Sequence, residues 1–109
     1  MTTPFPKQLD QVSVQLKANI YFDGKVVSHT LLEKDGSKKT IGLIYPGVYS
    51  FNTGAPECMM ITAGTCKIKL KGENKWESYA ADQAIEVPGN SSFEISVENG
   101  IAEYLCLFR

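Results

Sequence analysis

Apolar and polar residues alternate along most of the chain from Gln11 onward. A repeat of two is the pattern of a strand with one buried face, because successive side chains point to opposite sides. The clearest case places Phe93, Ile95 and Val97 on one face, with polar residues between them. Dipeptides typical of turns, such as Asp23-Gly24, separate the segments. The segments predicted as strands are 11–16, 18–22, 25–33, 40–45, 48–52, 57–63, 66–70, 76–79, 85–87, 93–97 and 102–108.

No segment shows a convincing helical period. Short strands with turn signals at close intervals are typical of a β-sandwich or barrel. The length of 109 residues suits one domain. Residues 1–10 carry two prolines and are expected to form a flexible N-terminal arm, while residues 11–109 form the barrel. We therefore predict an all-β, single-domain protein.

The overall charge excludes some classes of partner. Eleven basic and twelve acidic residues leave a net charge of −1, so nucleic acid is not expected to bind. No apolar run approaches the roughly 20 residues of a transmembrane helix, so no membrane association is expected. The N-terminal sequence MTTPFPKQLD lacks the apolar core of a signal peptide, so none is expected, and the odd number of cysteines favours a reducing cytoplasm.

The sulfur and imidazole groups give little sign of a reactive centre. Cys58, Cys66 and Cys106 are odd in number and lack Cys-x-x-Cys spacing, which argues against a disulfide framework. All lie in apolar segments, where free cysteine generally behaves as a small hydrophobe. The single histidine, His29, is predicted to make a structural hydrogen bond, because a histidine-rich metal site needs several ligands.

The stretch APECMMITAG, residues 55–64, places one carboxylate ahead of an apolar run. Glu57 is either a site residue at the mouth of a barrel or an ordinary charge at the start of a strand. The sequence leaves both interpretations open. Met59 and Met60 are expected to fill the barrel interior, and Gly64 is expected to bend the chain.

Two blocks, residues 47–64 and 82–93, resemble the two sequence motifs of the cupin barrel. The first cupin motif runs from a glycine through a His-x-His pair to a glutamate and a second glycine. Gly47, Glu57 and Gly64 stand in frame with the outer parts of this motif. The resemblance implies an RmlC-like jelly-roll β-barrel.

The metal-binding positions of that motif are occupied differently here. The histidine positions of the first motif fall near Thr53 and Ala55, and the gap before the glutamate is shorter. In the second motif, Asp82 takes the place of the usual glycine, Pro88-Gly89 keeps the turn, and Ser92 falls near the expected histidine. The chain therefore resembles a cupin that binds no metal.

A narrower resemblance covers the chain from about residue 12 to the C-terminus. Five blocks in this order and spacing are similar to the small single-domain pyrimidine/purine nucleoside phosphorylase family. The blocks are NIYFDGK (19–25), GVYSFNT (47–53), PECMMITAG (56–64), VPGNSSF (87–93) and YLC (104–106).

The resemblance implies phosphorolysis, in which a nucleoside and phosphate give a free base and (deoxy)ribose 1-phosphate. It implies a broad range of purine and pyrimidine nucleosides, a cytoplasmic homodimer, and inorganic phosphate as co-substrate with no cofactor. Phosphate is itself the nucleophile, so neither a protein nucleophile nor a metal is required.

For this reaction, Glu57 is the first candidate for a catalytic residue, since it could bind ribose hydroxyls or stabilise a cationic sugar. Short polar side chains and turn amides could cradle phosphate, although capping of turns is the alternative. These candidates are Thr53, Asn90, Ser91 and Ser92. Lys25 is the candidate cation, with an exposed hairpin lysine as the alternative.

The base would need an apolar face. Tyr49, Phe51 and Tyr104 are candidates for stacking against it, with packing in the core as the alternative. A stacking wall without dense hydrogen-bond readout suits broad specificity.

Two other functions compete with the phosphorylase. A non-catalytic cupin that binds a small metabolite is favoured by the scarcity of ionisable groups. A metal-dependent cupin oxygenase or isomerase is disfavoured by the missing histidines.

Overall fold

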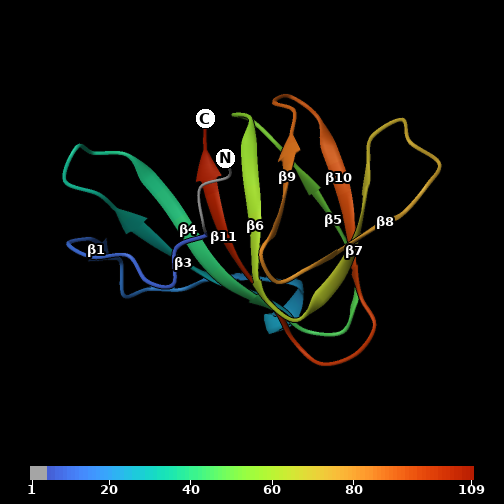
Figure 1. Cartoon of the computed structure of the whole chain (residues 1–109), viewed down its shortest axis with the longest axis horizontal. Helices are drawn as coiled ribbons and strands as arrows, with labels where there is room; N and C mark the ends of the chain where they lie inside the picture. The colour runs from blue at the N-terminus through green and yellow to red at the C-terminus, as the bar shows by residue number, and fades with distance from the viewer. Residues whose placement is uncertain (1–4) are drawn as a thin grey trace.

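The computed structural model describes residues 5–109 and consists almost wholly of strands (Figure 1). In this range the strands are β1 (Ser13–Val14), β2 (Asn19–Tyr21), β3 (Val26–Leu32), β4 (Lys38–Ile44), β5 (Gly47–Asn52), β6 (Glu57–Ala63), β7 (Thr65–Leu70), β8 (Glu77–Ala80), β9 (Gln83–Val87), β10 (Ser92–Val97) and β11 (Ala102–Phe108). One 3-10 turn, η1 (Phe22–Gly24), follows β2. No helix of the described range is long and apolar enough to cross a membrane.

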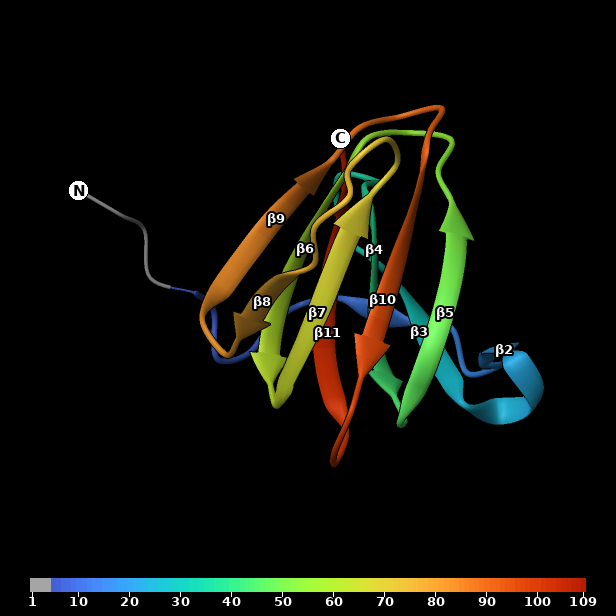
Figure 2. The same cartoon turned by 90° about the vertical axis from the view of Figure 1, so that its right-hand side faces the viewer.

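The strands form two antiparallel sheets that face each other (Figure 2). The larger sheet has seven strands in the order β1-β3-β4-β11-β6-β9, with β2 pairing beside β3. The smaller sheet has four strands in the order β5-β10-β7-β8. The chain passes repeatedly from one sheet to the other, as in a double-sheet jelly roll. The predicted all-β jelly-roll fold is confirmed.

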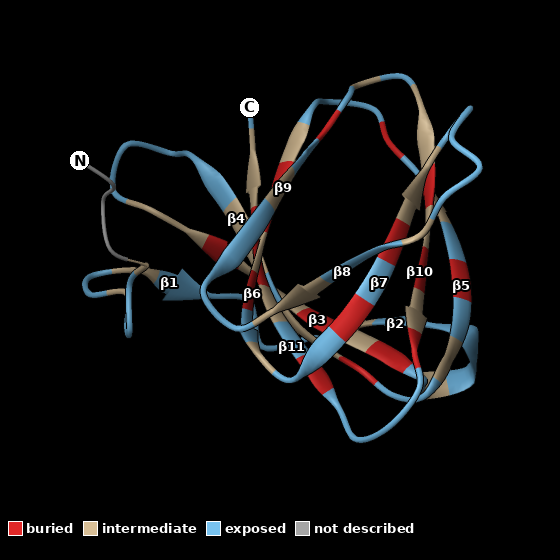
Figure 3. Cartoon of the chain, turned by 45° about the vertical axis from the view of Figure 1, so that its right-hand side comes forward, coloured by how far each residue is buried: buried red, intermediate tan, exposed pale blue. Residues whose placement is uncertain are grey.

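Apolar side chains from both sheets form one core. Figure 3 shows buried positions, in red, on strands of both sheets. Phe93, Ile95 and Val97, which were predicted to share a face, are all buried. The three cysteines are free and buried, as predicted. The buried core comprises Val26, Ile44, Tyr49, Met59, Ile61, Cys66, Ile68, Val87, Phe93, Ile95, Val97, Ala102 and Cys106.

The half-buried strand predicted over residues 11–16 is wrong in both length and burial. Pairing covers Ser13 and Val14 alone, against β3. Val14 is 49% exposed and Leu16 is 88% exposed. β1 lies at the edge of its sheet, and an alternating pattern does not supply the second layer needed to bury the apolar side.

The expectation that both methionines fill the barrel is also corrected. Met59 is buried between the sheets, whereas Met60 is only partly buried. The two residues are adjacent in β6, so their side chains point to opposite faces of the sheet. Only Met59 can contribute to the interior.

The large sheet has an irregularity where β6 pairs with the start of β11. The register between β6 and β11 shifts between Glu103 and Tyr104, which leaves Thr62 without a partner in this ladder. Gly64 lies close by, since a Cβ added there would be only 2.3 Å from the carbonyl oxygen of Ile101. The glycine therefore lets the β6–β7 turn approach the start of β11.

Candidate active site

A cavity of about 240 Å³ lies between the two sheets. It is mostly apolar, but a carboxyl, a phenol, a thiol, hydroxyls and an amide also reach it. Its lining comprises Tyr21, Val26, Ser28, Thr40, Ile44, Phe51, Asn52, Glu57, Met59, Phe93, Ile95, Tyr104, Cys106 and Phe108. A concave site with a few convergent polar groups is the usual form of a small-molecule site.

Glu57 is the one acidic residue of this lining. It is the first residue of β6, pairs with Phe108 on one side and Val87 on the other, and shares its face with Met59. The Cys106 thiol donates to its Oε1 over 3.4 Å. Burial raises the pKa of Glu57 above its ordinary value of 4.5, and the hydrogen bond from Cys106 partly opposes this. A half-buried carboxylate in a cleft is typical of a functional site.

Two protonated donors adjoin this carboxyl group. Burial raises the pKa of Tyr104 to about 12, against a lowering by its hydrogen bond with Ser28. Burial, followed by the charge of Glu57, raises the pKa of the Cys106 thiol. At neutral pH the Tyr104 phenol and the Cys106 thiol are therefore donors rather than anions. The Tyr104 ring lies flat over Gly42, where an added Cβ would be 2.7 Å from it.

An aromatic cluster forms another wall of the cavity. Phe51 stacks on Phe93 with ring centroids 5.6 Å apart, and Tyr21 meets Phe51 edge-on at 5.9 Å. Phe22 contacts Phe51 as well, at 5.5 Å. Figure 2 shows β2 and the turn that follows it beside β5, so these rings bridge the edges of the two sheets.

The turn that carries this cluster has an unusual backbone. Phe22 and Asp23 have φ values of 53° and 56°, which is uncommon for residues with a side chain. Such conformations persist where the surrounding contacts hold them, and they are frequent at functional sites. Tyr21 was not among the sequence candidates. The available signal was an aromatic pair immediately before the turn dipeptide Asp23-Gly24.

The structure brings together Glu57, Phe51 and Tyr104 of the predicted site residues. Thr53 lies outside the lining and clamps two loops instead. Its buried hydroxyl donates to the carbonyl of Pro88 over 2.7 Å and accepts from the Ser91 amide over 3.0 Å.

The other polar candidates also lie outside the lining. The backbone amide of Asn90 donates to the carbonyl of Gly54, so this backbone amide is already engaged within the protein. Ser92 precedes Phe93 in β10, and its side chain takes the opposite face from that cavity residue. Lys25 is exposed and does not reach the lining.

Tyr49 differs from the two aromatic candidates that reach the cavity. It is buried in the core, and its hydroxyl lies 2.8 and 2.9 Å from the carbonyl oxygens of Tyr45 and Pro46. Burial raises the pKa of this phenol. The ring contacts Phe22 at 5.0 Å, so it supports the aromatic cluster from behind.

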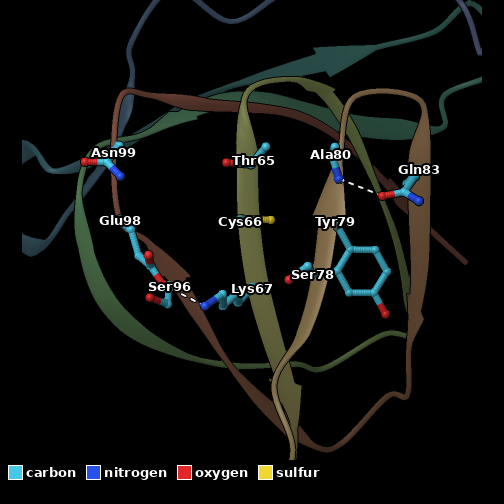
Figure 4. Close-up of a pocket in the computed structure, with 10 residues that line it drawn as sticks. All are labelled: Thr65, Cys66, Lys67, Ser78, Tyr79, Ala80, Gln83, Ser96, Glu98 and Asn99. Atoms are coloured by element: carbon cyan, nitrogen blue, oxygen red, sulfur yellow. Dashed lines mark hydrogen bonds and ion pairs between the residues drawn. The ribbon is translucent and has the colours of Figure 1, made fainter.

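Two further hollows have fewer features of a reactive site than the cavity between the sheets. One of about 270 Å³ lies over β7, β8 and β10 (Figure 4), and its lysine, Lys67, is paired with Glu98 at 2.8 Å. The largest, about 600 Å³, lies between residues 5–9 and the outer face of the large sheet. It is lined mainly by apolar side chains. The cavity between the sheets is the one of the three that contains Glu57, the half-buried carboxyl group.

Within residues 5–109, no three His, Cys, Asp or Glu side chains are placed to hold a metal ion together. The one histidine, His29, lies on the other side of β3 from the cavity residue Ser28. Its Nδ1 is 3.1 Å from the carbonyl oxygen of Gln15, in agreement with the predicted structural hydrogen bond.

The fold and the cavity define a small jelly-roll barrel with a half-buried carboxyl group between aromatic walls. The family model for pyrimidine/purine nucleoside phosphorylase matches residues 16–108, and the chain belongs to this family. A pyrimidine/purine nucleoside phosphorylase of Cupriavidus necator is 55% identical over 101 residues, covering 93% of this chain and 95% of the relative. That of Thiobacillus denitrificans is also 55% identical, covering 93% and 97%.

The fold agrees with a solved relative. The crystal structure of a protein of unknown function from Acinetobacter sp. ADP1 superposes with a TM-score of 0.91 at 39% identity. The match covers 94% of this chain and 98% of that one.

Proposed function

We propose that the protein is a nucleoside phosphorylase of broad specificity, which converts purine and pyrimidine nucleosides and phosphate to free base and (deoxy)ribose 1-phosphate. The observation that carries this proposal is Glu57, a half-buried carboxyl group of raised pKa in an aromatic-walled cavity. Membership of the family supports the reaction class.

In this reaction the bond between the anomeric carbon and the base nitrogen breaks, and its electron pair leaves with the base. An oxygen of hydrogen phosphate forms the new bond to the anomeric carbon, and the proton that the phosphate gives up balances the one that the base nitrogen gains. Positive charge develops on the sugar between these events, and the Glu57 carboxylate stabilises it. The protonated Tyr104 and Cys106 can donate hydrogen bonds within the same cavity.

The size of the cavity bears on specificity. Its volume of about 240 Å³ is below the roughly 300 Å³ at which small-molecule sites begin. A nucleoside would therefore be enclosed at its sugar and lie partly outside at its base. Tyr21 is 45% exposed at this opening and offers an aromatic face. Stacking accepts every base, because each has a π-face, which suits a broad substrate range.

The direct test is phosphate-dependent release of uracil from uridine and adenine from adenosine by the purified protein, followed by chromatography. Release that requires phosphate and yields ribose 1-phosphate supports the proposal. Stabilisation by nucleosides in a thermal-shift assay without turnover would instead identify a small-metabolite-binding barrel.

Replacing Tyr21 by Ala is expected to raise KM for nucleosides about tenfold, because a base–aromatic stack contributes about 1–3 kcal/mol. KM for phosphate should stay within twofold. Steady-state kinetics with uridine and adenosine measure both values. Tyr45→Ala is the matched control, since Tyr45 is similarly exposed but does not line the cavity. An equal KM for Tyr21→Ala and wild type would remove Tyr21 from the base site.

We propose that the protein is a cytoplasmic homodimer. The family resemblance favours a homodimer, and three free cysteines accord with a reducing compartment such as the cytoplasm.

A further inference from the structure

The cavity has no cationic side chain in its lining among residues 5–109. Phosphate carries negative charge at neutral pH and would have to approach the Glu57 carboxyl group. Like charges at close range oppose binding unless a cation offsets them. A positively charged group is therefore expected near the cavity mouth.

Lys38 meets this requirement by its position. It is the first residue of β4 and lies two residues before Thr40, so both share the face that turns toward the cavity. Its Nζ lies 5.1 Å from the ring centroid of Phe108, a distance typical of a cation–π contact. Phe108 lines the cavity and pairs with Glu57.

Lys38 is unpaired, unlike the adjacent Lys39, which is bound to Glu33. Lys69, in the other sheet, is paired as well, 3.4 Å from Glu94. No carboxylate within residues 5–109 forms an ion pair with Lys38. Its ammonium group is thus available to an anion from solution.

We propose that Lys38 binds the co-substrate phosphate at the mouth of the cavity, with the Thr40 hydroxyl and the Asn52 amide as further donors. This inference rests on the proposed phosphorylase function. Thr40 and Asn52 both reach the cavity and come from opposite sheets. Phosphate held there stands beside the carboxyl group that faces the sugar, which is the placement that attack on the anomeric carbon needs.

The test compares Lys38→Met with Lys69→Met. Lys69 makes the same kind of contact with an aromatic ring, 5.2 Å from the centroid of Trp76, but its side chain takes the face of β7 opposite to the buried Ile68. Lys38→Met is expected to raise KM for phosphate about tenfold or more, as for loss of a hydrogen bond to a charged group. KM for nucleosides should change less than twofold. Lys38→Arg should restore most of the phosphate affinity.

Binding of inorganic phosphate, titrated by ³¹P nuclear magnetic resonance without nucleoside, separates this inference from the proposed function. Phosphate binding that Lys38→Met weakens, in a protein without turnover, would uphold the site and overturn the phosphorylase. Turnover with unchanged phosphate affinity in Lys38→Met, or a stronger effect of Lys25→Met, would overturn the site alone. Absence of phosphate binding by the wild type would also overturn it.

Discussion

Replacing Glu57 by Gln is expected to lower kcat/KM for phosphorolysis by about a hundredfold or more, because the amide cannot offset the positive charge of the transition state. The substitution keeps the size of the side chain. It also keeps an oxygen that can accept from the Cys106 thiol, which lies 3.4 Å from Oε1 in the native protein. Release of base under saturating phosphate measures the effect.

Glu86→Gln is the matched control for this experiment. Glu86 belongs to β9, the strand that pairs with β6, but it is exposed and bound to Arg109 at 2.8 Å. The Glu86→Gln variant loses the same charge as Glu57→Gln, but outside the cavity. Its kcat/KM should therefore stay within about twofold of wild type. Similar losses in the two variants would show that general electrostatics rather than a site carboxylate governs the rate.

The pH dependence of stability distinguishes a site carboxylate from a structural one. Burial raises the folded-state pKa of Glu57 above 4.5, so the folded protein holds this proton more tightly than the unfolded chain. The stabilisation that this tighter proton binding gives the folded state is fully present below the unfolded-state pKa of Glu57. It is lost as pH rises through the folded-state pKa. Glu57→Gln should therefore unfold at the same or a higher denaturant concentration than wild type at pH 7. Above pH 4.5 its unfolding midpoint should also change less with pH. Marked destabilisation at pH 7 would indicate a structural role.

The sequence was sufficient for the parts of the fold that depend on local pattern. Phe93, Ile95 and Val97 alternate without interruption, and all three are buried as that pattern predicts. Glu57 opens an apolar strand, so its place at one end of the barrel also followed from order along the chain. The same alternation failed at Leu16, where nothing covers the apolar side.

The rest of the candidate site depends on contacts between distant segments. Lys38 and Phe108 are 70 positions apart, and only the pairing of β4 with β11 brings them together. The hydroxyl of Thr53 accepts a hydrogen bond from the backbone amide of Ser91, 38 positions further along the chain. Both groups are thus engaged within the protein, although the sequence alone left them available to phosphate. No local period encodes either contact. Position after the Asp23-Gly24 turn therefore favoured Lys25 as the cation, whereas topology places Lys38 against Phe108 of the cavity lining.

Gly64→Ala is expected to cost about 3 kcal/mol or more of the free energy of unfolding, a value toward the severe end for a single substitution. Gly64 has a φ of +77°, and a Cβ there would lie 2.3 Å from the carbonyl oxygen of Ile101. Backbone must move to admit it. The displaced segment is the start of β11, the strand that carries Tyr104 and Cys106, so the folded fraction should also lose activity. Urea denaturation and base release measure the two effects.

Comparing Gly64→Ala with Gly72→Ala separates two costs in the free energy of unfolding: that of the steric clash and that of the left-handed backbone conformation. Gly72 has a similar φ of +85°, but nothing lies within 4 Å of an added Cβ. Its substitution should cost only about 1–2 kcal/mol, the penalty for placing an alanine in the left-handed region. The difference between the two variants then measures how firmly the β6–β7 turn is held against β11. Equal costs would mean that this turn moves freely and that the position of the start of β11 does not depend on Gly64.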